Sequence, residues 1–375
     1  MTTRVAIVHD ALVNTGGAER VVTFLCEAFP DAPLFTSAYL PDKTFPEFRQ
    51  RDVRVLSGGA GVTSESDAKR RLPLWLWGFS HLDLSGFDVV LSSTTFAAKH
   101  VRPPRGVRHV TYCYAPFRLL WKPEAYAASS LPVGRVAQQA LNLVRPLLRR
   151  YDRAAMQRVD AVATTCRNMA AAIKTAYGRD AEIIHAPVRL ADFQVARVTE
   201  DYYLSVSRLM SHKRVELAVE ACRRLGRRLV VVGDGPERAR LAALGGDRVT
   251  LAGGVDAAAL AQLYAGCRAL LFCSEEDYGL TPIEAQASGR PVVAYGAGGA
   301  LETVTEGQSG IFFKEQTTDS LVDAIRRFEQ MTFDPVRVRE SVERFDVGPF
   351  VRRMREFVNG DAARGTVARQ TDRET

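Results

Sequence analysis

Short apolar runs rich in β-branched residues alternate with longer amphipathic segments along most of the chain. The first run, residues 5–8, leads into a loop containing Gly16 and Gly17 and then into an amphipathic stretch over 18–29. The order strand, glycine loop, helix predicts an α/β domain with a parallel sheet. Further strand-like runs lie at 89–91, 110–112, 161–163, 202–206, 229–232, 249–251, 269–273 and 291–295, and further helical patterns at 136–144, 168–177 and 215–225.

A polar break at 186–200 interrupts this alternation, and the pattern then starts again. We therefore predict two α/β domains, the first over 1–193 and the second over 194–345. Apolar residues at helical spacing over 346–359 predict a C-terminal helix. The polar residues 360–375 have no periodicity and predict a disordered tail.

The composition excludes several classes of protein. Of the 375 residues, 46% are hydrophobic and 25% are charged, which is ordinary for a globular protein and unlike a disordered or collagen-like chain. No run approaches the roughly 20 apolar residues of a membrane span, and the N-terminus turns polar too soon for a signal peptide. We therefore expect a cytoplasmic protein. The six cysteines form no CxxC pair and have no metal-ligand spacing, so we expect small buried thiols and no metal site.

Positive charge is concentrated in the first half of the chain. Residues 1–190 carry 25 Lys and Arg against 16 Asp and Glu, while the whole chain has a net charge of +7. Such an excess fits nucleic acid, an anionic membrane surface, an anionic substrate or simply a solvated basic surface. No nucleic-acid recognition motif accompanies it, so we predict no nucleic-acid partner.

One segment places two glutamates around a predicted helix start. Glu276 follows a buried strand, Gly279 permits close approach of a ligand, and Glu284 lies early in the following helix. The backbone amides of Gly279, Leu280 and Thr281 would form an anion site at the helix N-terminus. The two carboxylates would bind hydroxyls of a sugar nucleotide, or would only complement the helix dipole.

Two further loops follow predicted strands. Arg208 and Lys213 lie in a strand-to-helix loop, where they would suit a diphosphate or form a solvated basic loop. Gly233-Asp234-Gly235-Pro236 follows the strand at 229–232. It lacks the third glycine of a dinucleotide fingerprint, so it would face a nucleotide or simply reverse the chain.

Together these motifs resemble the retaining glycosyltransferases of family 4. The spacing Glu276-x7-Glu284, the pair Arg208 and Lys213, the phrase Gly16-Gly17-Ala18-Glu19 and the glycines at 298–299 occur in the family's order. The resemblance covers about residues 4–358. It implies an α/β fold of the GT-B type, with two Rossmann-like domains facing across a cleft and a C-terminal helix crossing back to the first domain.

The resemblance also implies roles for the matching residues. Arg208 and Lys213 would neutralise the donor diphosphate and Glu276 would bind sugar hydroxyls, so these three are the expected catalytic residues. The family needs no metal, because cationic side chains and a helix dipole stabilise the leaving group, and no cofactor is expected. The expected donor-binding residues are Gly16, Gly17, Gly235, Val255, Tyr278, Gly279, Leu280, Thr281 and Glu284.

Three phrases, at 9–12, 112–121 and 275–286, are similar to the mannosyltransferase-type enzymes of bacterial surface polysaccharide assembly. Those enzymes typically take GDP-mannose and extend a lipid-linked oligosaccharide. They usually have a histidine where this chain has Tyr114, which is a departure from their pattern. Tyr114 and Arg118 are expected on the side of the acceptor and the transferred sugar.

Two segments mix basic with aromatic or apolar residues, namely 69–79 with Trp75 and Trp77, and 145–150. Such mixtures favour the headgroup region of an anionic membrane, and they also arise from core aromatics beside a solvated charged face. The first interpretation makes the protein peripheral at the inner face of the plasma membrane.

The expected function is therefore retaining transfer of a sugar, with GDP-mannose as the first choice of donor, to a glycan hydroxyl. The alternatives are the same reaction with a UDP-sugar, a sugar-nucleotide 2-epimerase, or a non-catalytic nucleotide-sugar-binding protein. The Glu276-x7-Glu284 phrase argues against the epimerase.

Overall fold

The computed structural model describes residues 3–57, 61–62, 64, 67, 71–121, 135–196 and 198–360. The chain divides into two compact units. The described part of the first unit runs to Trp121, resumes over 135–187 and takes up the chain again at Gly348, while the second unit holds Val188–Val347. Lys69, Arg70 and, apart from Gly360, the expected tail 360–375 lie outside the described residues.

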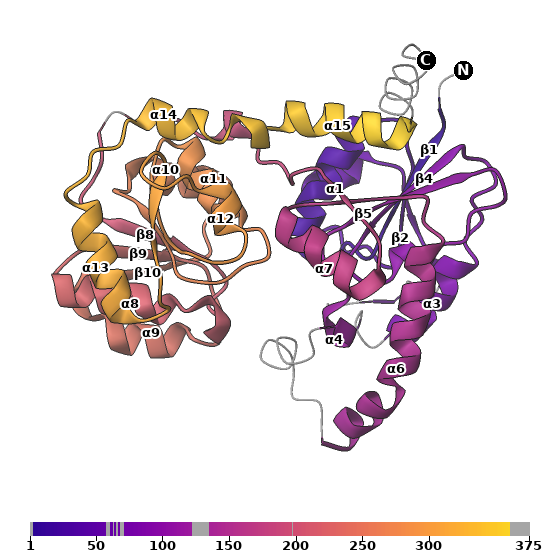
Figure 1. The fold of residues 1–375 in the computed structure, drawn as a ribbon, viewed down its shortest axis with the longest axis horizontal. Coiled ribbons are helices and arrows are strands. Elements are labelled where there is room, and N and C mark those ends of the chain that lie inside the picture. The colour runs from indigo at the N-terminus through magenta and orange to yellow at the C-terminus, as the bar shows by residue number, and fades with distance from the viewer. Residues whose placement is uncertain are drawn as a thin grey trace, which may run out of the picture. The chain divides into compact units, whose positions relative to one another are not determined.

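A seven-stranded sheet in the order β3-β2-β1-β4-β5-β6-β7 forms the centre of the first unit, and every neighbouring pair is parallel (Figure 1). The central strands are buried on both faces, which explains their continuous apolar or small-residue runs. The strands are β1 (Val5–His9), β2 (Leu34–Thr36), β3 (Val53–Val55), β4 (Val89–Thr94), β5 (Arg108–Cys113), β6 (Ala161–Thr164) and β7 (Glu182–Ile183). The helices are α1 (Gly17–Ala28), α3 (Leu72–Ser80), α4 (Arg118–Trp121), α6 (Arg135–Gln157), α7 (Arg167–Tyr177) and α15 (Val347–Asn359).

The second unit contains a parallel six-stranded sheet in the order β10-β9-β8-β11-β12-β13. Apolar clusters fill both faces of this sheet. The strands are β8 (Tyr203–Val206), β9 (Leu229–Val232), β10 (Val249–Gly253), β11 (Leu270–Phe272), β12 (Val292–Tyr295) and β13 (Gly310–Phe313). The helices are α8 (Val215–Leu225), α9 (Arg238–Gly245), α10 (Ala257–Gly266), α11 (Leu280–Ala287), α12 (Ala300–Thr303), α13 (Thr318–Phe328) and α14 (Pro335–Glu340).

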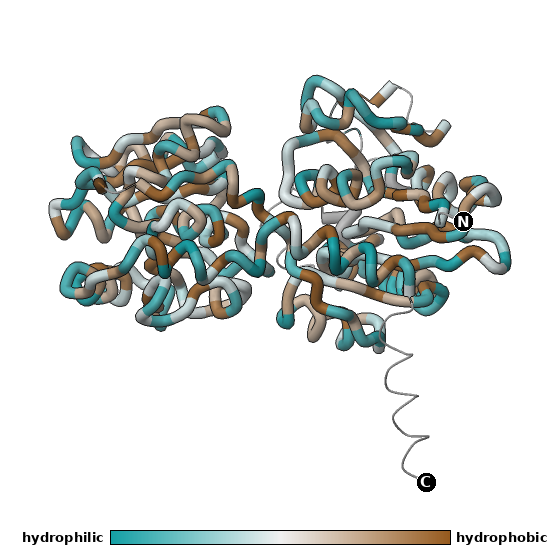
Figure 2. Tube along the Cα trace, turned by 90° about the horizontal axis from the view of Figure 1, so that it is seen from above, coloured by the Kyte–Doolittle hydropathy of each residue, from teal (hydrophilic) through white to brown (hydrophobic). Residues whose placement is uncertain are grey.

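The structure confirms the predicted α/β class, and every predicted strand is present, β9 with the predicted bounds. The sequence pattern missed β2, β3, β7 and β13. These strands have two to four residues, and none lies in an apolar run as long as residues 229–232 or 269–273. Figure 2 shows hydrophobic and hydrophilic residues alternating along the trace of both units. Among the described residues, no helix is long and apolar enough to cross a lipid bilayer.

Helix α15 packs on the first unit although it follows the second in sequence. The Arg355 Nε donates to the carbonyl oxygen of Ala28 at the end of α1, at 2.9 Å. The Arg108 side chain of β5 donates to the carbonyl oxygen of Val358 at 2.7 Å, and Phe350 meets the ring of Tyr112 edge-on. The returning helix of the predicted fold is therefore anchored by contacts along its length.

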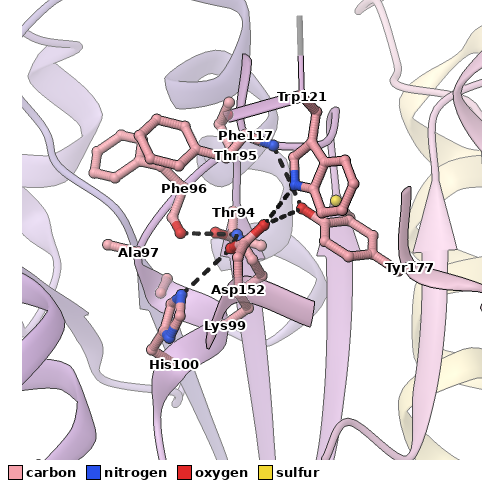
Figure 3. A network of polar contacts seen from close by, with 12 residues as sticks. Thr94, Thr95, Phe96, Ala97, Lys99, His100, Phe117, Trp121, Asp152 and Tyr177 are labelled. Atoms are coloured by element: carbon pink, nitrogen blue, oxygen red, sulfur yellow. Dashed lines mark hydrogen bonds and ion pairs between the residues drawn. The ribbon is translucent and has the colours of Figure 1, made fainter. Parts of the chain in front are cut away.

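A buried polar network ties together the elements around α6 (Figure 3). The Lys99 Nζ lies 2.9 Å from Asp152 Oδ1 on α6, and both side chains are almost wholly buried. Asp152 also accepts hydrogen bonds from Trp121 Nε1 at the end of α4, at 2.9 Å, and from the Tyr177 hydroxyl of α7, at 2.8 Å. One carboxylate thus joins α4, α6 and α7 to the turn that follows β4.

Asp10 fixes the backbone of the turn that follows β4. Its carboxylate accepts hydrogen bonds from four consecutive backbone amides, those of Thr95, Phe96, Ala97 and Ala98, at 2.6–3.0 Å. Asp10 therefore positions the backbone that carries Lys99, which is a structural reason for the acidic residue at the end of the first strand.

Candidate functional site

The basic and acidic loops of the second unit meet at the carboxyl edge of its sheet. Strand β8 lies between β9 and β11, so the loops that follow these three strands are neighbours. In open parallel sheets, ligands bind at this edge. The arrangement brings together two of the expected catalytic residues, Lys213 and Glu276.

The Nζ of Lys213 lies 2.7 Å from Oε1 of Glu276, and the two side chains keep 16% and 25% of their exposure. The Ser274 hydroxyl donates to the same oxygen of Glu276 at 3.0 Å. Partial exposure leaves the pair accessible to a ligand. The third expected catalytic residue, Arg208, lies in the same loop as Lys213 and has an exposed side chain.

The residue after Lys213 has an unusual backbone conformation. Arg214 takes φ of 55°, the left-handed region, which is costly for a residue with a side chain. Its guanidinium donates to the carbonyl oxygen of Gln316 at 3.2 Å and lies 3.3 Å from Glu216 Oε1. These contacts hold the sharp turn that ends the short 3-10 helix Ser211–Lys213.

Two glycines fix the loop of Glu276. The amide of Gly299 donates to the carbonyl oxygen of Glu276 at 2.8 Å. A Cβ at Gly298 would overlap the same carbonyl oxygen, and one at Gly299 would overlap the backbone of Tyr278. Backbone contact at this distance requires glycine, so the glycine pair noted in the sequence has a positioning role.

The position of Gly235 requires glycine because of its backbone contacts. Together with Gly233 it lets the loop after β9 lie against the backbone of Ser207 and Leu209, where a Cβ at either glycine would overlap a carbonyl oxygen. The amide of Leu209 donates to the carbonyl oxygen of Asp234 at 2.9 Å. These contacts brace the loop that carries Arg208 and Lys213.

Helix α11 begins directly after the acidic loop. Gly279 is its N-cap, with φ of 82° and no side-chain cap. Leu280 and Thr281 follow in the first turn, where backbone N–H groups point out of the helix and attract anions. Tyr278 is 8% exposed, and its ring packs edge-on against Phe345. Tyr278 therefore contributes its backbone and a buried ring to this edge.

Glu284 has a partner that the sequence analysis missed. Its Oε2 accepts a hydrogen bond from the buried hydroxyl of Tyr264 on α10 at 2.7 Å. Burial, and then the charge of Glu284, raises the pKa of Tyr264 well above its usual value, so the hydroxyl stays protonated and donates. The sequence signal for this contact is weak: a single tyrosine in a helix made mostly of alanine and leucine. Val255 is half-buried against the apolar cluster on this face.

The expected residues of the first unit lie around the start of α1 and the end of β5. Gly16 is the N-cap of α1, and Gly17 is its exposed first residue. The Tyr114 hydroxyl, just after β5, bonds to Ser93 and to the backbone of Ala18. Arg118 begins α4 with an exposed side chain.

Among the described residues, no three or more His, Cys, Asp or Glu side chains are grouped so that they could hold a metal ion. All six cysteines are buried and form no disulfide. Burial raises the pKa of Cys26 to about 11, which keeps that thiol protonated. Lys213, Arg208, Glu276 and the start of α11 offer cations and amides that suit an anion, beside a carboxylate that suits hydroxyls.

Comparison with known proteins follows the same division of the chain. Residues 15–192 match the family described as Glycosyltransferase Family 4, and residues 190–344 match the family described as Glycosyl transferases group 1. The chain is 35% identical over 131 residues to the glycogen synthase of Pseudomonas aeruginosa, a match that takes up 32% of this chain and 26% of that protein. It is 34% identical over 138 residues to the GDP-mannose-dependent alpha-(1-6)-phosphatidylinositol monomannoside mannosyltransferase of Mycobacterium tuberculosis, 32% of this chain and 36% of that protein. The matches thus span about a quarter to a third of these relatives.

Solved structures extend the likeness of the fold over the whole chain. The sucrose-phosphate synthase of Thermosynechococcus elongatus has a TM-score of 0.71 at 20% identity, covering 99% of this chain and 100% of that one. Anabaena HepE in complex with UDP and glucose has a TM-score of 0.71 at 18% identity, covering 96% and 100%. Two adjoining family matches and a shared GT-B fold lead to one conclusion: the chain belongs to the glycosyltransferases of family 4.

Proposed function

We propose that this chain is a retaining glycosyltransferase that moves a sugar from a nucleoside diphosphate to a glycan hydroxyl, with GDP-mannose as the donor. The observation that carries the proposal is the partly exposed pair of Lys213 and Glu276 beside the start of α11. A cation, a carboxylate and a helix N-terminus at one sheet edge suit a diphosphate joined to a polyhydroxylated ring.

In this proposal the cationic residues bind the diphosphate and the carboxylates bind hydroxyl groups. Lys213 and Arg208 neutralise the diphosphate as the bond from the anomeric carbon to the phosphate oxygen breaks. Glu276 accepts hydrogen bonds from sugar hydroxyls, and Glu284, oriented by Tyr264, accepts them from the ribose. The acceptor oxygen bonds to the anomeric carbon on the same face, and its proton passes to the leaving phosphate. No metal is required in this scheme.

The choice of GDP-mannose is supported by the matching phrases of the sequence and by the mycobacterial relative, whose name gives GDP-mannose dependence. A UDP-sugar donor is the alternative, and the two are separated by measurement. A thermal-shift series with GDP, UDP, ADP and dTDP and their sugars, in EDTA, reports binding to the native state. A thermal shift with GDP and GDP-mannose alone supports the proposal. A thermal shift with UDP compounds alone would mean that the donor is a UDP-sugar.

Turnover then separates an enzyme from a binding protein. Release of GDP from GDP-mannose in the presence of lipid-linked glycan acceptors is expected with the wild-type chain. Binding without turnover over a panel of acceptors would favour the non-catalytic alternative. Loss of binding on addition of EDTA would contradict metal independence.

The acceptor side of the proposal includes an anionic membrane surface. Of the two tryptophans on α3, Trp75 belongs to the core, but Trp77 is 60% exposed, and Leu143 and Leu147 on α6 are 83% and 69% exposed. Helices α3 and α6 both pack against the 3-10 turn Ala98–His100. Exposed apolar residues beside Arg150 suit insertion among anionic headgroups.

Arg149 does not belong to that surface, because its guanidinium donates to the carbonyl oxygen of Leu120 and lies over the ring of Trp121. Binding to phosphatidylglycerol vesicles is therefore tested with Leu143→Asp/Leu147→Asp, and with Val336→Asp, an exposed apolar position of the second unit, as the control. Loss of binding only in the α6 variant supports the membrane surface. Equal binding by the wild type, the α6 variant and the Val336→Asp control, or binding by none of them, would contradict the membrane surface.

A further inference from the structure

Three side chains at the carboxyl edge of the first sheet form a hydrogen-bonded chain that ends on helix α1. His9, the last residue of β1, stands opposite Ser93 of β4, and its Nδ1 lies 3.0 Å from the carbonyl oxygen and 3.1 Å from the Oγ of Ser93. The Ser93 Oγ lies 2.9 Å from the hydroxyl of Tyr114. That hydroxyl lies 3.1 Å from the carbonyl oxygen of Ala18.

The position of each proton in this series of hydrogen bonds can be assigned by starting at the carbonyl oxygen of Ala18. A carbonyl oxygen only accepts, so the Tyr114 hydroxyl donates to Ala18. A hydroxyl has one proton, so Ser93 in turn donates to Tyr114. The Nδ1 of His9 faces the Ser93 carbonyl oxygen and therefore carries a proton and donates. Burial lowers the pKa of His9, so its ring is neutral at pH 7.

The last hydrogen bond of this series reaches the first turn of α1. Gly16, the N-cap of α1, makes no side-chain cap. The first turn of the helix is closed by the amide of Arg20, which donates to the carbonyl oxygen of Gly16 at 3.0 Å. The bond from Tyr114 to Ala18 ties this turn to the end of β5.

We propose that Tyr114 is a positioning residue that holds the first turn of α1, with Gly16 and Gly17, against the edge of the sheet. The proposal rests on the proposed function and on the expectation that Gly16 and Gly17 bind the donor. Tyr114 takes no part in proton transfer, because its proton is committed to Ala18. Burial raises the pKa of Tyr114 far above its usual value, which agrees with this role.

Tyr112 provides a matched control. It lies two residues earlier on β5, is wholly buried, and donates its hydroxyl to the carbonyl oxygen of Ile184 at 2.7 Å. Tyr112→Phe and Tyr114→Phe each remove a hydroxyl that donates to a backbone carbonyl oxygen, but only the bond of Tyr114 reaches α1.

Hydrogen exchange of the ligand-free protein tests the positioning without any assay of activity. In Tyr114→Phe, exchange at the amides of residues 20–22 is expected to speed up about tenfold, the factor for one lost buried hydrogen bond, with no change in Tyr112→Phe. Unchanged exchange in Tyr114→Phe, or equal acceleration in both variants, would overturn the proposal.

Kinetics test its consequence for the donor. Tyr114→Phe is expected to raise the KM for the donor about tenfold while kcat stays within about twofold, because binding and not chemistry is disturbed. A loss of kcat at unchanged KM would overturn it in favour of a role in proton transfer. If the wild-type chain turns over no nucleotide sugar, the proposed function fails, and the exchange experiment still decides the positioning.

Discussion

Each of the two units contains a close lysine–carboxylate pair. The two pairs have similar N–O distances but differ in how far their side chains are exposed to water. Lys99 and Asp152 lie 2.9 Å apart with 0% and 2% of their side chains exposed. Lys213 and Glu276 lie 2.7 Å apart with 16% and 25% exposed. The first pair joins α6 to the turn after β4, and the second lies at the carboxyl edge of the second sheet.

The difference follows from the cost of removing charges from water. A buried pair is tolerated only when further hydrogen bonds satisfy both partners. Lys99 donates to the carbonyl oxygen of Phe96 at 2.8 Å, and Asp152 accepts from Trp121 and Tyr177 (Figure 3). Burial alone would raise the pKa of Asp152, but the charge of Lys99 and hydrogen bonds from His100 and Trp121 lower it well below its usual value. This pair cannot change partners without unfolding its surroundings.

Lys213 and Glu276 retain contact with water, so each can exchange its partner for a ligand at small cost. Without a ligand, each neutralises the other. A donor would offer phosphate to Lys213 and hydroxyls to Glu276 in the same step. The comparison indicates that the buried pair maintains the fold, and it favours our proposal that the partly exposed pair exchanges partners with a ligand.

The largest effect is expected from breaking the buried pair. Asp152→Ala leaves Lys99 buried and uncompensated, and we expect the free energy of unfolding to fall by about 3–5 kcal/mol. Urea denaturation measures the loss. Asp180→Ala breaks the exposed pair of Lys174 and Asp180, at 2.8 Å, and should cost at most about 1 kcal/mol. Equal losses in the two variants would show that burial does not distinguish the pairs.

The next effect concerns turnover. Lys213→Ala removes a cation from the leaving diphosphate, and we expect kcat to fall about 10²–10³-fold, with the urea midpoint nearly unchanged. Steady-state release of nucleotide measures it. Lys174→Ala, which also breaks an exposed ion pair, serves as the control and should keep full activity. Turnover near that of the wild type in Lys213→Ala would refute the assignment of the site.

The smallest effect tests the exchange of partners directly. Glu276→Gln frees Lys213 from its carboxylate, so GDP without a sugar should bind about three- to tenfold more tightly, as for removal of a partly exposed competing charge. Turnover should fall in the same variant. Isothermal titration measures the affinity. Glu220→Gln, which breaks ion pairs with Arg223 and Arg224 within α8, should leave it unchanged. Weaker binding of GDP to Glu276→Gln would mean that the pair does not compete with phosphate.

Much of this architecture is visible in the sequence, because it depends on neighbouring residues. The β-branched runs predict the central strands, because burial on both faces favours apolar and small residues. The spacing of Glu276 and Glu284 across Gly279 places one carboxylate before a helix start and one within the helix. Strands such as β3 and β7 are interrupted or flanked by charged residues and lack such a run.

Other features were decided only by contacts between distant segments. Trp75 and Trp77 are equivalent in the sequence, but the first packs in the core and the second is exposed. Nothing near Glu284 predicts the hydroxyl of Tyr264, and nothing near Tyr114 predicts its bond to Ala18. Periodicity and turn chemistry act over a few residues, whereas burial and the partner of each charge depend on which segments the fold packs together. The sequence therefore specifies the elements and their candidate chemistry, and the packing determines which side chain meets which.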